Sequence, residues 1–145
     1  MEKIATFNVN GECTEASGMM SSSAIGYKAT GQLIINATDD VFNTGNGSFG
    51  ISGTLLTLMA PDGSDALNKV PIRDFPLHDE YQLVDGKFSI DLSFDNMDVN
   101  VMGTLLQDGT KLENIVVTVN ITKWTWKFFI KSLKIVCTGI RISFE

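Results

Sequence analysis

Residues 81–122 read YQLVDGKFSIDLSFDNMDVNVMGTLLQDGTKLENIVVTVNIT, and this stretch decides the fold class. After Asp85-Gly86, positions 88, 90, 92 and 94 are apolar and positions 87, 89, 91 and 93 are polar. A period of two predicts a β-strand with one buried and one exposed side. Asp-Gly between two strand-like runs also predicts a hairpin with a two-residue I′ turn, because both central residues of that turn have φ > 0.

A second Asp-Gly pair, Asp108-Gly109, separates the strand-like runs 99–106 and 112–122 and predicts a second hairpin of the same kind. Val, Ile, Thr and Phe are plentiful along the whole chain, and glycines punctuate the runs. We therefore expect an all-β, antiparallel fold, as a β-sandwich or a closed β-barrel of about 8–10 strands. The length of 145 residues suits a single domain over 1–145.

The remaining segments divide by composition into strands and connections. Alternation over 3–10 predicts a first strand, and 25–36 predicts another with a bulge or bend at Gly31. Small polar residues over 11–23 predict a flexible loop or arm. All three prolines of the chain fall within 61–80, where we expect an irregular connection.

The C-terminal segment 123–145 is basic, whereas the rest of the chain is acidic. Residues 1–122 hold six basic and sixteen acidic side chains (−10), and 123–145 hold five basic and one acidic (+4), which together give the net charge of −6. The negative net charge argues against non-specific nucleic-acid binding, because such binding requires many lysine and arginine side chains that neutralise phosphates. The asymmetry is compatible with head-to-tail pairing of two copies or with an anionic surface as partner, but we favour basic strands that lie on an acidic sheet within one molecule.

Residues 123–136 fit two different structures. Lysines at 123, 127, 131 and 134 form a stripe on a helix, as in interfacial membrane helices. With a period of two, one face instead carries aromatic and aliphatic side chains and the other is mostly lysine. We favour basic strands over 123–145, with a break at Thr138-Gly139, because Trp, Phe, Thr and Ile suit strands.

These two faces supply the candidate ligand-binding or partner-binding residues. The apolar face would line a barrel pocket, fill the core or anchor a partner, and the lysines would flank it. The candidates are Trp124, Trp126, Phe128 and Ile130 on the apolar face, and Lys123, Lys127 and Lys131 on the other.

No catalytic or metal-binding pattern stands out. His78 is the only histidine, which excludes a His-rich zinc site, and no serine occupies a nucleophile-elbow context. Carboxylates at Asp62/Asp65 and Asp95/Asp98 lack the full spacing of a calcium loop. We therefore expect no catalytic residues, no metal and no cofactor.

Cys13 and Cys137 do not form a disulfide framework, and we expect two free buried thiols. The sequence starts directly with strand-like alternation, and no apolar run approaches a membrane-spanning length, so we expect a cytoplasmic or virion protein.

Together these observations favour a non-enzymatic β-module for assembly or protein-partner binding, such as a self-associating microbial or viral structural subunit. The expected partner is a second copy, in a homo-oligomer, or another protein, rather than nucleic acid or a membrane. The alternative is a carrier of a small apolar molecule, with a barrel pocket lined by the face that contains Trp124 and Ile130.

Overall fold

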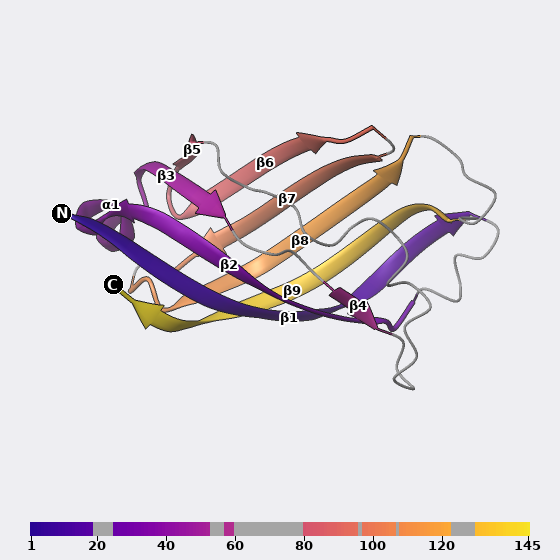
Figure 1. The fold of residues 1–145 in the computed structure, drawn as a ribbon, viewed down its shortest axis with the longest axis horizontal. Helices are drawn as coiled ribbons and strands as arrows, with labels where there is room; N and C mark the ends of the chain where they lie inside the picture. The colour runs from indigo at the N-terminus through magenta and orange to yellow at the C-terminus, as the bar shows by residue number, and fades with distance from the viewer. Residues whose placement is uncertain (19–24, 53–56, 60–79, 96, 107, 123–129) are drawn as a thin grey trace.

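The computed structural model describes residues 1–18, 25–52, 57–59, 80–95, 97–106, 108–122 and 130–145. Within them, nine strands form one antiparallel sheet that nearly closes into a barrel (Figure 1). The strands are β1 (Glu2–Gly18), β2 (Lys28–Thr38), β3 (Gly47–Ser52), β4 (Thr57–Met59), β5 (Glu80–Leu83), β6 (Lys87–Ser93), β7 (Met97–Leu105), β8 (Lys111–Ile121) and β9 (Ile130–Phe144).

Across the sheet the strands follow the order β5-β3-β2-β1-β9-β8-β7-β6, and β4 pairs with β2 beyond the end of β3. The long central strands β1 and β9 therefore join two halves of the sheet. One half consists of β1 to β5, from the N-terminal part of the chain, and the other of β6 to β9, from the C-terminal part. The prediction of an all-β, antiparallel, single-domain fold is confirmed. Of the two predicted architectures, a sandwich or a closed barrel, the structure is closer to the barrel.

The interior is filled by the alternating apolar side chains of the strands. On β1, Ala5, Phe7 and Val9 are buried, as their period-two pattern predicts. The rings of Phe49 on β3 and Phe88 on β6 lie 5.6 Å apart and connect the two halves close to the gap between β5 and β6. Burial of such large apolar surfaces is the main force that draws the two sheet edges together.

One end of the barrel is covered by the short helix α1 (Asp39–Thr44), beside which both ends of the chain lie (Figure 1). The ring of Phe42 on this helix packs edge-on against the ring of Phe144 at a centroid distance of 5.2 Å. The guanidinium of Arg141 lies 4.2 Å from the centre of the Phe144 ring, in a cation–π contact. Helix and C-terminus together shield the core at this end.

Strand β1 is longer than the sequence predicts. Residues 11–18, expected as part of a flexible arm over 11–23, are strand and pair with β9, so this part of the prediction is wrong. Gly11 lies opposite Cys137, and a Cβ at Gly11 would lie only 2.5 Å from the Cys137 sulfur. The small residues therefore permit close strand approach here instead of marking a loop. Residues 19–24 lie outside the described residues.

The C-terminal strand β9 is continuous from Ile130 to Phe144, so the expected break at Thr138-Gly139 is wrong. Gly139 is paired with both neighbouring strands, opposite Val9 and Leu112. A helix over 123–136 is excluded for residues 130–136, which are strand, whereas 123–129 lie outside the described residues.

Two further expectations concern irregular backbone. Gly31 pairs with Val9 without a shift in register, so the bulge predicted there is wrong. A bulge occurs instead in β8, where Glu113 and Asn114 are both exposed and Asn114 has φ 51°. Residues 61–79 of the expected irregular connection lie outside the described residues, and Glu80 begins β5.

The hairpin predicted at Asp85-Gly86 is half correct. Asp85 has φ 52° and Gly86 φ 79°, as an I′ turn requires, and Val84 and Lys87 form the paired bridge around them. Beyond this bridge the strands separate, because β5 pairs with β3 whereas β6 pairs with β7. The turn therefore crosses from one edge of the sheet to the other.

The hairpin predicted at Asp108-Gly109 is confirmed in its strands, since β7 and β8 pair along their length. Its turn is wider than the expected two residues. The Leu106 N–H donates to the Lys111 carbonyl (3.1 Å), and the Gly109 N–H donates to the Leu106 carbonyl (2.8 Å). The strands are thus closed by a bond between Leu106 and Lys111, outside the Asp108-Gly109 pair.

Candidate interaction surface

Of the predicted site residues, the structure describes Ile130 and Lys131. Ile130 is buried and Lys131 is exposed, in agreement with the predicted alternation at these two positions. Trp124, Trp126, Phe128, Lys123 and Lys127 lie outside the described residues.

The outer side of the sheet carries an apolar row that the sequence reasoning missed. Met102 on β7 pairs directly with Val116 on β8, which pairs directly with Val136 on β9. The side chains of Met102 and Val136 are 47% and 37% exposed, and Val116 is half-buried. Directly opposite positions bring side chains into contact, so the three form a continuous strip on the solvent side. We call these three residues the apolar row.

A signal for the apolar row exists in the sequence but is weak. Val116 and Val136 each stand between inward-facing apolar residues, so each run looks like an unbroken buried segment. Sequence alone does not show that the outward residues of three strands share one register. Further along β9, Ile140 and Ile142 are also exposed, at 61% and 54%.

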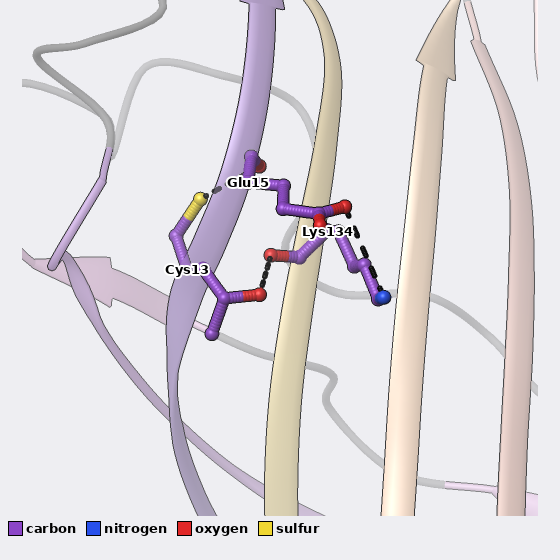
Figure 2. A network of polar contacts seen from close by, with 4 residues as sticks. Cys13, Glu15 and Lys134 are labelled. Carbon is purple, nitrogen blue, oxygen red and sulfur yellow. Dashed lines mark hydrogen bonds and ion pairs between the residues drawn. The ribbon is translucent and has the colours of Figure 1, made fainter.

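Polar and charged side chains border the apolar row. On its β9 side, the ammonium of Lys134 lies 3.8 Å from the carboxylate of Glu15 (Figure 2). On its β6 side, the amide of Asn100 donates to Asp91 (2.8 Å) and to Ser89 (3.0 Å). The next row of outward-facing residues, two positions along each strand, consists of Asp91, Asn100, Thr118 and Lys134 in direct register. Asp91 and Lys134 therefore place opposite charges at the two ends of this row.

A bulge in β1 links this border to the core. Between Cys13 and Glu15 the register with β9 shifts by one residue, so Cys13 faces inward while Glu15 faces outward. The Cys13 thiol donates to the Glu15 carbonyl (3.4 Å), and the Thr14 hydroxyl donates to the Lys134 carbonyl (3.4 Å) (Figure 2). Beside this bulge lies a surface hollow of about 440 Å³, lined by residues that include Glu15, Ser132 and Lys134.

The two thiols lack the properties of a nucleophile. Cys13 and Cys137 are both free and buried, as the sequence predicts. Burial raises the pKa of Cys13, an effect that hydrogen bonds with the backbone of Glu15 and Lys134 partly offset. Burial raises the pKa of Cys137 to about 12. Both therefore stay protonated at neutral pH, and the thiolate is the reactive form.

Within the described ranges, no three His, Cys, Asp or Glu side chains are grouped so that they could hold a metal ion. No helix in the same part of the chain is long and apolar enough to cross a membrane.

Comparisons with known proteins found no similar sequence or structure. No family model matches the chain, and neither the curated proteins nor the solved structures contain a match. The physical features of the surface therefore carry the functional argument.

Proposed function

We propose that this protein is a non-enzymatic β-module that self-associates through the outer face of β7, β8 and β9. The observation that carries the proposal is the apolar row, in which Met102, Val116 and Val136 lie side by side on the solvent side. Contiguous exposed apolar surface with a polar border is typical of protein interaction sites.

Removal of this surface from water supplies the driving force for association. Each Å² of apolar surface buried contributes about 25 cal/mol, part of which offsets the entropy lost when two molecules associate. A strip three side chains wide is small, so we expect a reversible, concentration-dependent pair. Formation of a larger microbial or viral structure would need additional contacts beyond this pair.

The border charges favour a second copy as the partner. If a two-fold axis runs parallel to β8, the strand order reverses in the other copy, so β7 of one copy lies over β9 of the other. Asp91 of one copy then approaches Lys134 of the other. Charge complementarity of this kind orients an encounter and sets its register.

Sedimentation velocity over a range of protein concentrations tests the proposal. The double variant Met102→Gln/Val136→Thr removes apolar character while it keeps a similar side-chain shape at both positions. We expect the dissociation constant of the pair to rise about tenfold or more. Val84→Thr is the matched control, because Val84 is 62% exposed but lies outside the apolar row.

A wild-type protein that stays monomeric at its highest soluble concentration would exclude self-association. Equal dissociation constants for the wild type and the double variant would place any association elsewhere on the surface.

The alternative function, a carrier of a small apolar molecule, has less support. The barrel interior, in the part that the structure describes, is occupied by large side chains such as Phe7, Phe49 and Phe88. Quenching of tryptophan fluorescence by a fatty acid would favour the carrier over the self-associating module.

A further inference from the structure

Strand β7 carries two methionines, and its alternation places them on opposite sides of the sheet. Met97 faces the core and is fully buried, whereas Met102 faces outward in the apolar row and is 47% exposed. Oxidants convert methionine to its sulfoxide, and they reach a sulfur atom only where it is accessible. The sulfur of Met102 is therefore open to an oxidant, and that of Met97 is protected.

The two thiols of the chain do not compete with Met102 for the oxidant. Cys13 and Cys137 are both buried. Burial raises the pKa of each thiol, to about 12 for Cys137, so both stay protonated at neutral pH. The thiolate is the form of cysteine that oxidants attack. The accessible sulfur of the interaction surface is thus the thioether of Met102.

Oxidation changes the property on which the apolar row depends. The lone pair of the Met102 sulfur attacks one oxygen of a hydroperoxide, and an S–O bond forms as the O–O bond breaks. The proton on the transferred oxygen moves to the leaving oxygen, which departs as water or an alcohol. The sulfur is oxidised, the peroxide is reduced, and an apolar side chain becomes a polar one.

The position of Met102 in the pair makes this change costly. In the two-fold arrangement β7 lies over β9 of the other copy, so Met102 lies over Val136, which donates no side-chain hydrogen bond. A sulfoxide oxygen buried there loses its water without gaining a donor. In the separate molecules the same oxygen stays hydrated. Oxidation therefore favours separation, and by linkage pairing protects Met102 from the oxidant.

We propose that Met102 is a reversible oxidation site that controls self-association. A hydroperoxide converts Met102 to the sulfoxide and separates the pair. A methionine sulfoxide reductase restores the thioether and the pair, and the oxygen leaves as water while a dithiol is oxidised to a disulfide. The inference rests on the proposed function, because the modified residue belongs to the apolar row.

Sedimentation velocity before and after treatment with hydrogen peroxide tests the switch, and mass spectrometry of proteolytic peptides measures the sulfoxide at Met102. We expect the dissociation constant of the pair to rise about tenfold or more when Met102 is fully oxidised. Methionine sulfoxide reductases for both sulfoxide epimers, with dithiothreitol, should return it to the starting value. An unchanged dissociation constant after full oxidation of Met102 would overturn the switch.

Two variants assign the effect to this residue. Met102→Leu keeps an apolar side chain of similar volume, so it should associate as the wild type does and ignore peroxide. This variant also controls for oxidation of the other methionines and both cysteines. Met102→Gln makes the position polar without oxidant and should associate as weakly as the oxidised wild type. Equal loss of association in Met102→Leu and in the wild type after peroxide would place the sensitive residue elsewhere.

The rate of Met102 oxidation gives an independent test. We expect it to fall as the protein concentration rises through the dissociation constant, because pairing covers Met102. Met1, which is 91% exposed and lies outside the apolar row, is the internal reference and should react at a constant rate. A wild type that never associates would overturn the proposed function and the switch together. A wild type whose association does not protect Met102 would overturn the switch alone.

Discussion

The turns at Asp85-Gly86 and Asp108-Gly109 contain the same two residues and differ in conformation and in what holds them. At the first turn both residues have positive φ, and the strands beyond it separate onto opposite edges of the sheet. The second turn is closed by a bond between Leu106 and Lys111, and its strands remain paired. A dipeptide that favours a turn therefore determines neither the type of the turn nor whether the two flanking strands pair with each other.

The hydrogen bonds explain the difference. The first turn is held from outside its own strands: the Gly86 N–H donates to the Gly45 carbonyl (2.8 Å), and the Asp85 N–H donates to the side-chain oxygen of Asn46 (3.0 Å). The second turn has a bond of its own, from the Thr110 N–H to the Asp108 carboxylate (3.1 Å). It is also held by Arg141 on β9, whose backbone N–H donates to the Thr110 carbonyl (2.9 Å) and whose guanidinium donates to the Gly109 carbonyl (3.1 Å). Both turns therefore have tertiary partners, and they differ in which segment holds them: the residues between α1 and β3 hold the first, and β9 holds the second.

Gly86→Ala tests this contrast with the largest expected effect. Gly86 has φ 79°, and a Cβ there would lie 2.5 Å from the Leu105 carbonyl oxygen, a backbone atom that cannot easily move. We expect the free energy of unfolding, measured by chemical denaturation, to fall by about 3 kcal/mol.

The matched control is Gly109→Ala, where φ is 69° but the nearest atom to the added Cβ, on the Arg141 side chain, is 3.5 Å away. Only the conformational penalty remains, about 1 kcal/mol. Equal losses in the two variants would show that tertiary packing does not distinguish the turns.

Asn46→Ala removes the side-chain acceptor that fixes the first turn to the segment between α1 and β3. We expect the free energy of unfolding to fall by about 1–2 kcal/mol, because the Asp85 N–H loses its partner. Gln32→Ala, which removes an exposed side-chain bond to Asn8, serves as the control and should change stability by less than about 0.5 kcal/mol. A loss in Asn46→Ala no larger than in this control would indicate that water replaces the Asn46 oxygen.

Asp108 tests the second turn through pH and gives the smallest effect. Hydrogen bonds from the backbone and side chain of Thr110 hold the pKa of the Asp108 carboxyl below its ordinary value. The ionised form is thus favoured in the folded state, and its contribution to stability is present above the unfolded pKa of about 3.9. It is lost as pH falls through the lower folded pKa.

Carbon-detected NMR titration of the Asp108 carboxyl group measures this pKa directly. Asp108→Asn keeps the acceptor oxygen but does not titrate, so its stability should lack this part of the acid dependence. An ordinary pKa for Asp108 in the folded protein would contradict the local hydrogen bonds.

Local patterns predicted the inward faces of the strands well. The alternation that includes Phe7 and Val9, and that after Gly86, both describe the buried side correctly, because a strand with one dry side requires period two. The same reasoning failed for residues 11–18, where small polar residues form strand, because this segment pairs with β9, and Gly11 lies opposite Cys137, 126 positions away.

The apolar row could not be predicted for a similar reason. The apolar row requires Met102, Val116 and Val136 to share one register across three strands, and a shift of one residue would turn any of them inward. Register between strands is set by the packing of the whole core, so single-segment patterns do not contain it.

The sequence by itself determined the all-β class, the inward face of the strands and the positions of the two Asp-Gly turns. These properties follow from side-chain chemistry at short range along the chain. Tertiary structure alone decided that β5 pairs with β3 instead of β6, that β1 continues to Gly18 and that outward-facing apolar residues lie side by side on β7, β8 and β9. Each of these depends on which distant strands come together, because the free energy of burying the core is shared by all of them at once.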